Sequence, residues 1–174
     1  IWHTASDSDE FLSRGWIGRY FDNCCSGTAR PQAGVSLGKD RPQAFDGEKG
    51  VGVAFEDPTN FGWKPGKATD TAEKFEKINA ALAKKNDTLD FLRHTTSNAI
   101  MSSYEVNEAA QRGGFNKNGQ RANMKEPLQT VAALIRGDLQ TRIYYVGSGG
   151  FDTHVNQRDS HDTLLLRFSQ SIAR

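Results

Sequence analysis

The chain has 174 residues, of which 25% are charged and 36% are hydrophobic, and its formal net charge is +1. This length and composition suit a single globular domain that buries a core of its own. The near-neutral charge, without a basic stripe interleaved with aromatic residues, gives no reason to expect nucleic acid as a partner. No run of the sequence approaches the ~20 apolar residues that a membrane span needs.

Residues 1–66 are rich in glycine, proline, asparagine and aspartate, which predicts loops with short strands between them. The short strands are expected at 35–37 and 51–55, where β-branched and aromatic residues gather. Residues 15–21 favour a short helix or a buried turn. The run from Asp57 to Trp63 is typical of a turn that carries two aromatic side chains.

The two cysteines, Cys24 and Cys25, are adjacent. A disulfide between neighbours closes a strained ring, so we expect ordinary thiols rather than a structural bridge. The spacing also lacks the C-x-x-C pattern of a zinc site.

Residues 70–112 are predicted to be helical. Asp70 followed by Glu73 resembles a capping box, and the helical spacing after it predicts a buried face formed by Phe75, Ile78 and Leu82. A break at 86–87 starts a second, longer helix, which Gly113 and Gly114 end. The charged residues of the first helix are expected to face solvent.

A third helix is expected from Pro127, since proline is favoured in a first turn, and Gly137 is expected to close it. Its predicted buried face is Leu128, Val131, Ala132, Leu134 and Ile135. The β-branched and aromatic run at 141–146 then predicts an interior, mostly parallel strand, with Tyr144 and Tyr145 on opposite faces. A glycine turn and a last helix near 159 complete the order helix, strand, turn, helix, which is typical of an α/β sheet.

Asp152 and His154 follow the end of this strand, where ligands bind in open α/β sheets. In an extended segment, side chains two residues apart point the same way, so the carboxylate of Asp152 and the imidazole of His154 converge. These two ligand types are an adequate start for a zinc, manganese or similar site. His161 and Asp162 are candidates for groups that orient a ligand. The alternative is structural: Asp152 forms an Asx turn and His154 bonds a backbone carbonyl.

Other chemistries at this loop fit the letters less well. A dinucleotide fingerprint starting at Gly147 fails because Asp152 takes the place of its last glycine. The G-K-[ST] of a phosphate-binding loop is absent, and Val146 breaks the pattern of a nucleophile elbow around Ser148. Ser148 with His161 as a nucleophile and its base stays open as a further alternative.

Several motifs resemble one family over nearly the whole chain. The most specific is the run from Gly149 to His154, reading GGFDTH and followed by Asn156-Gln157. The segment 15–20, reading GWIGRY, also agrees, as do the residues Val35-Ser36-Leu37-Gly38, Phe55, Asp57-Pro58 and Phe61-Gly62-Trp63. In this respect the chain resembles the bacterial domain-of-unknown-function 1501 family, which is grouped with the alkaline phosphatase and sulfatase superfamily.

The resemblance implies an alkaline-phosphatase-like fold with a mostly parallel sheet flanked by helices. It implies a metal-dependent hydrolase of phosphate or sulfate esters, acting on a small anionic ester. Asp152 and His154 are then candidate ligands of a divalent metal (zinc, manganese or calcium), with Gly149, Gly150 and His161 on the substrate side or behind the ligands. The alternative is a non-catalytic secreted or cell-surface protein that keeps the fold without the chemistry.

The resemblance also implies that residues 1–174 form one partial domain. Its parts are the loop-rich 1–66, the helical 70–137 and the strand–turn–helix segment 141–174. The nucleophile and the remaining ligands are expected in N- and C-terminal segments of a longer parent chain. Family precursors often carry a twin-arginine export signal, which implies a periplasmic or extracellular location.

Overall fold

The computed structural model of the protein describes residues 1–24, 30–62, 73–75, 77, 87–115 and 127–173. Its elements are α1 (Trp16–Cys24), η1 (Pro31–Ala33), β1 (Gly34–Leu37), η2 (Gln43–Phe45), β2 (Val53–Phe55), α3 (Asp87–Arg112), α4 (Pro127–Arg136), β3 (Ile143–Val146) and α5 (Gln157–Ile172), where η1 and η2 are single 3₁₀ turns. The expectation of a mixed α/β protein is confirmed. Among the helices described, none is long and apolar enough to cross a membrane.

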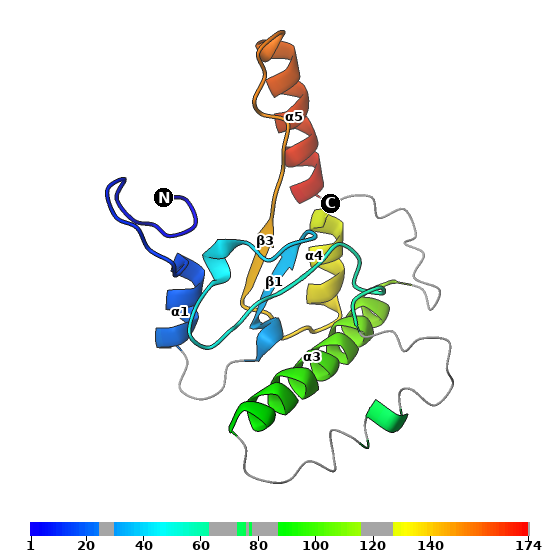
Figure 1. Cartoon of the computed structure of the whole chain (residues 1–174). Helices are drawn as coiled ribbons and strands as arrows, with labels where there is room; N and C mark the ends of the chain where they lie inside the picture. The colour runs from blue at the N-terminus through cyan, green and yellow to red at the C-terminus, as the bar shows by residue number, and fades with distance from the viewer. Residues whose placement is uncertain (25–29, 63–72, 76, 78–86, 116–126, 174) are drawn as a thin grey trace.

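The three strands form one parallel sheet in the order β2-β1-β3 (Figure 1). Val35 of β1 pairs with Val53 on one side and with Tyr144 on the other. The strand predicted at 141–146 is therefore parallel, as expected, but in the described part of the chain it lies at the edge of the sheet. The prediction of an interior position was wrong because a continuous apolar run also suits an edge strand whose two faces are both covered.

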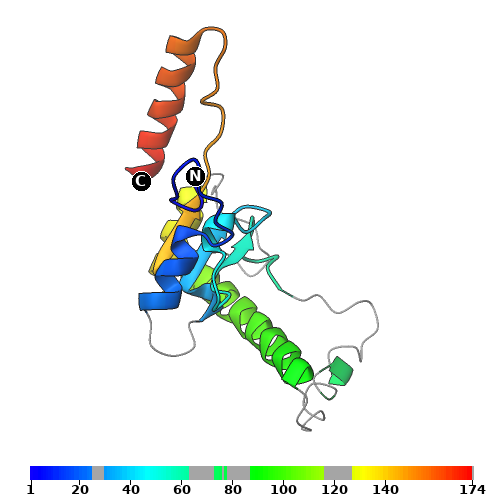
Figure 2. The same ribbon diagram turned by 60° about the vertical axis from the view of Figure 1, so that its left-hand side comes forward.

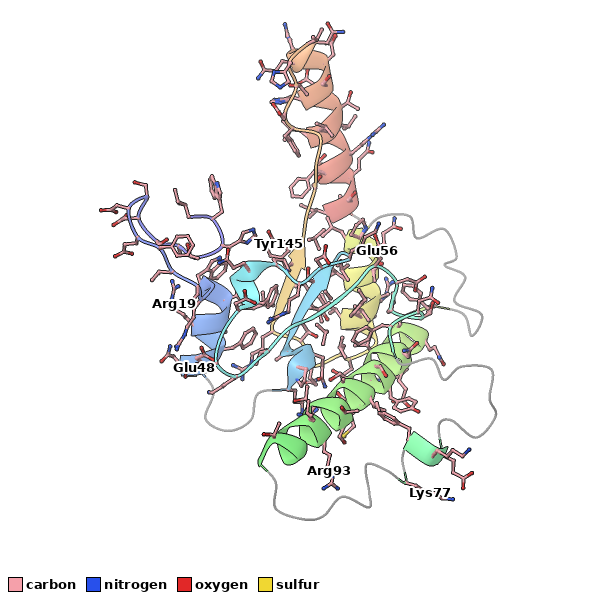
Figure 3. The ribbon with its side chains drawn as sticks, in the orientation of Figure 1. Arg19, Glu48, Glu56, Lys77, Arg93 and Tyr145 are labelled. Carbon is pink, nitrogen blue, oxygen red and sulfur yellow. The ribbon has the colours of Figure 1, made fainter. Side chains whose placement is uncertain are left out.

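Helices cover both faces of the sheet, with α1 and η2 on one side and α3 and α4 on the other (Figures 1 and 2). Tyr144 packs against the cluster on the α3–α4 side, and Tyr145 packs against the cluster on the α1 side, as their alternation predicted. The ring of Tyr145 lies edge-on to Phe45, with centroids 6.1 Å apart, where β3 passes η2 (Figure 3). The fold is thus a small three-layer sandwich with a core on each face of the sheet.

The contact between α3 and α4 depends on glycines that end each helix. A Cβ added at Gly113 would lie 1.8 Å from the carbonyl oxygen of Ala133, and one added at Gly137 would lie 1.8 Å from that of Ala109. The two helices therefore touch backbone to backbone at their carboxyl ends, a distance that only glycine permits. Glycine at both positions was predicted as a helix stop, and the structure adds that it is also the packing contact.

An arginine from each helix extends to the end of the other. Arg112 donates to the carbonyl oxygen of Gly137 at 3.0 Å, and Arg136 donates to that of Gly113 at 3.4 Å. Cations next to helix carboxyl ends satisfy carbonyls that have no partner within the helix. This exchange fixes α4 against α3, and so fixes where β3 begins.

The buried face of α4 differs from the predicted one. Thr130, Ala133 and Leu134 are buried, whereas Ile135 is 59% exposed. Leu134 is buried as predicted, whereas Thr130 and Ala133 were not predicted and are buried where α3 approaches closely. Leu128, Val131 and Ala132 are half buried at the margin of this contact.

Two further expectations for the first half of the chain are revised. Phe75 is half buried rather than buried, and Ile78 and Leu82 lie outside the described residues. Cys24 is disulfide-bonded rather than a free thiol. Ring strain makes a disulfide between neighbouring cysteines costly but does not forbid it.

Helix α5 stands apart from the sandwich. Both views show it beyond the upper end of β3, with its carboxyl end near the start of α4 (Figures 1 and 2). None of its 16 residues, all of them described, is buried. Its place is set by the segment 147–156, which carries the residues singled out above.

Candidate functional site

The chain leaves β3 at Gly147 and runs beyond the carboxyl edge of the sheet before α5 begins. Gly150 has a φ of 94°, a backbone conformation that residues with a side chain rarely adopt. An added Cβ there would also meet the side chain of Leu164 of α5 at 3.5 Å. Glycine at 150 therefore lets the segment turn closely past the helix that follows.

Asp152 and His154 lie next to each other on this segment. Oδ1 of Asp152 is 3.2 Å from Nε2 of His154, and their side chains are 91% and 84% exposed. Thr153 between them is half buried, so the side chains alternate as in an extended segment. The expected convergence of an acid and an imidazole at the carboxyl edge is present.

The separation of these two atoms can be compared with that of two ligands of one metal ion. Ligands about 2.0–2.2 Å from an ion, at the roughly 90–110° of tetrahedral or octahedral coordination, stand about 2.8–3.6 Å apart. The observed 3.2 Å falls within that range. The pair fits two positions of a metal site, although the same distance also fits an ion pair between a carboxylate and a protonated imidazole.

Further ligands are not gathered around the pair. In the part of the chain that the structure describes, no group of three or more histidine, cysteine, aspartate or glutamate side chains could hold an ion. A metal held tightly by protein usually needs three or four such groups. The pair is at most half of a metal site.

The structural alternatives for these residues can be checked directly. α5 begins at Gln157, and the residue before it, Asn156, is left-handed with no side-chain cap. Asp152 therefore does not cap the helix, and His154 is exposed rather than buried against a backbone carbonyl. Among the described residues, the carboxylate of Asp152 contacts His154 and accepts no backbone hydrogen bond, so the Asx turn of the structural alternative is not formed.

His161 bonds to the backbone rather than to either candidate ligand. Its Nε2 is 3.0 Å from the carbonyl oxygen of Phe151, and the two rings meet edge to face with centroids 5.9 Å apart. This contact holds the residue immediately before Asp152 against the first turns of α5. His161 thus positions the segment, and its bond goes to Phe151 rather than to Ser148, its partner in the alternative nucleophile–base pair.

A pocket of about 340 Å³ lies beside the glycine turn. Gly149 lines it, whereas Asp152, His154 and Gly150 do not. The hollow at the carboxyl edge of the sheet is therefore displaced from the two candidate ligands. Its walls come from the end of β3, the start of α4 and the second half of α5: Pro127, Leu128, Val146, Gly147, Ser148, Gly149, Leu164, Arg167, Phe168 and Ser171.

Sequence reasoning missed Arg167, the only charged residue among the described residues of this lining. A signal for it was present in the helix. Leu164, Arg167, Phe168 and Ser171 follow the spacing i, i+3, i+4 and i+7, which places them on one face. The sequence did not reveal what that face would meet.

A second hollow, of about 400 Å³, lies beyond the ends of β1 and β2. Asp57 lines it, but its Oδ1 accepts bonds from the backbone N–H and the hydroxyl of Thr59 at 2.9 and 2.7 Å. That carboxylate forms an Asx turn. Lys39 and Glu56 contribute charges of opposite sign to the lining, so the hollow favours no single class of ligand.

No protein-family model, no curated protein and no solved structure matches this chain. The resemblance to the domain-of-unknown-function 1501 family thus rests on its motifs alone and stays a prediction.

Proposed function

We propose that this protein is a metal-dependent hydrolase of phosphate or sulfate esters, and that residues 1–174 hold part of its active site. The observation that carries the proposal is the pair Asp152–His154, with oxygen and nitrogen 3.2 Å apart and open to solvent beyond the carboxyl edge of a parallel sheet. Ligand sites in such sheets form at that edge. The GGFDTH resemblance supplies the reaction class.

In this proposal Asp152 and His154 hold a divalent cation (zinc, manganese or calcium). When bound, the cation polarises the ester and stabilises the negative charge that develops on it. His161 holds the backbone before Asp152, and Gly149 and Gly150 leave room for the substrate. The remaining ligands and the nucleophile would come from other segments of a longer parent chain, as the family resemblance implies.

The proposal includes a periplasmic or extracellular location. It rests on the family resemblance, since family precursors often carry a twin-arginine export signal.

The test is the metal content of the intact protein, measured by elemental analysis after dialysis. We expect Asp152→Ala and His154→Ala each to weaken metal binding by at least about tenfold, since losing even a group behind a ligand costs 10–100-fold. Hydrolysis of p-nitrophenyl phosphate or p-nitrocatechol sulfate should fall with the metal. Asp159→Ala, which removes an exposed carboxylate from α5 at a residue with no assigned role in the site, is the matched control.

The second candidate is a non-catalytic secreted or cell-surface protein with the same fold. What favours it is that only two ligand-type side chains meet in the described residues. If the purified protein holds metal at trace level only, and both variants behave like Asp159→Ala, this second candidate replaces the first.

A further inference from the structure

Among the residues that the structure describes, the pocket beside the glycine turn is lined by one cation and no anion. Arg167 contributes the charge, Ser148 and Ser171 contribute hydroxyls, and no lining residue is acidic. The guanidinium of Arg167 forms no hydrogen bond or ion pair with any residue that the structure describes, and its side chain is exposed. The pocket therefore attracts a negatively charged ligand.

The rest of the lining suits a small ligand. Leu128, Val146, Leu164 and Phe168 give the pocket apolar walls. Its volume of about 340 Å³ is at the low end of the roughly 300–1,000 Å³ of small-molecule sites. Added Cβ atoms at Gly147 and Gly149 would meet nothing within 4 Å, so the turn leaves its side of the pocket open.

The pocket adjoins the candidate metal ligands along the chain. Gly149 is three residues before Asp152 and lines the pocket, so their Cα atoms are at most about 10 Å apart. A substrate held in the pocket is thus close to the segment that carries Asp152 and His154.

We propose that this pocket binds the tetrahedral oxyanion of a phosphate or sulfate ester, with Arg167 as the residue that selects the anion. The planar guanidinium matches two oxygens of such a group at once. The proposal rests on the ester hydrolase function, because it assigns an anion subsite for that enzyme's substrate or product, next to the candidate metal ligands along the chain and separate from them. It needs no contribution from the start of α4, where Pro127 has no backbone N–H to donate.

The test is titration of the intact protein with inorganic phosphate and with sulfate, in EDTA and at constant ionic strength maintained with chloride. Calorimetry gives the affinity, and NMR shows whether the amides of 147–149 respond. We expect saturable binding that Arg167→Gln weakens by about tenfold or more, the effect of losing a charge-assisted hydrogen bond. The affinity of Arg167→Lys should fall between those of the unmodified protein and Arg167→Gln. An ammonium keeps the positive charge but cannot contact two oxygens at once, as the planar guanidinium does.

Arg158→Gln is the matched control, because it removes an exposed arginine of the same helix that does not line the pocket. It should change the affinity by less than about twofold. Equal weakening by Arg158→Gln and Arg167→Gln, or no saturable binding of either anion by the unmodified protein, would overturn the proposal. Because Arg167 is exposed, its variants should unfold at the same temperature as the unmodified protein.

Phosphate and sulfate titrated separately show which ester the pocket prefers. The anion titration is made without metal, so its outcome is independent of the metal site. Arg167→Gln should keep full metal content, and Asp152→Ala should keep anion binding. If Arg167→Gln loses anion binding and the unmodified protein holds no metal, the anion pocket is supported and the hydrolase function is contradicted.

Discussion

Asp152 and His154 are brought together by the alternation of side chains along an extended segment, with Thr153 turned inward between them. This geometry is local, so two residue types at a spacing of two were enough to predict it. The role of His161 was not predictable in the same way. Its bond to Phe151 spans ten residues and depends on how α5 folds back along the segment.

Tyr144 gives a prediction about pH. Burial against the α3–α4 layer raises the pKa of Tyr144 above its ordinary value near 10, because the charged phenolate loses water. The folded protein therefore favours the neutral phenol. This contribution to stability is complete below the unfolded pKa and is lost as the pH rises through the folded pKa.

Urea unfolding between pH 8 and pH 11 checks this prediction. We expect the free energy of unfolding of Tyr144→Phe to fall less over the alkaline half of that range than that of the unmodified protein. Tyr104→Phe, which changes an exposed tyrosine of α3, should leave the alkaline loss as it was. If Tyr144→Phe and Tyr104→Phe give the same profile, the phenol of Tyr144 is not the group responsible.

At the scale of elements, the pair α3–α4 combines a shared apolar cluster with a close backbone contact at the carboxyl ends of the helices. We expect Gly137→Ala to lower the free energy of unfolding by about 1–3 kcal/mol or more, because its methyl group would overlap the carbonyl of Ala109. Chemical denaturation measures the change. Gly38→Ala should stay within about 0.5 kcal/mol, since an added Cβ there meets nothing within 4 Å.

Similar losses in Gly38→Ala and Gly137→Ala would show that the contact between the helices is not the cause.

The same contact explains why the buried face of α4 differs from the predicted one. Helical spacing predicted the burial of Leu134 correctly, but the position of α3 decides that Thr130 is buried and that Ile135 is exposed.

At the scale of the whole molecule, the sandwich and α5 are separate in their contribution to stability. The two cores lie on the faces of the sheet and include no residue of α5. We expect removal of residues 156–174 to leave the thermal unfolding midpoint within a few degrees of its original value, measured by circular dichroism. A collapse of the midpoint would show that α5 belongs to the cooperative unit.

The same truncation bears on function, because it deletes Arg167 and one wall of the pocket while leaving Asp152 and His154 in place. We expect it to abolish phosphate binding without metal. A truncated protein that still binds phosphate with unchanged affinity would place the anion site elsewhere.

The sequence by itself determined the features that depend on neighbours along the chain. These are the strands at 35–37 and 53–55, the helices after 87 and 127 with their glycine stops, and the strand at 143–146 followed by Asp152 and His154. Local periodicity and turn chemistry fix such features. They were sufficient for the α/β class and for half of a candidate site.

Only the tertiary structure decided the edge position of β3 among the described strands, the burial of Thr130 and Ala133 in α4 and the pocket around Arg167. Each depends on segments far apart in sequence. The pocket joins residues 127–128, 146–149 and 164–171, and no local pattern states that these will meet. The physical reason is that packing is a property of pairs of surfaces, whereas periodicity reports only that one surface exists.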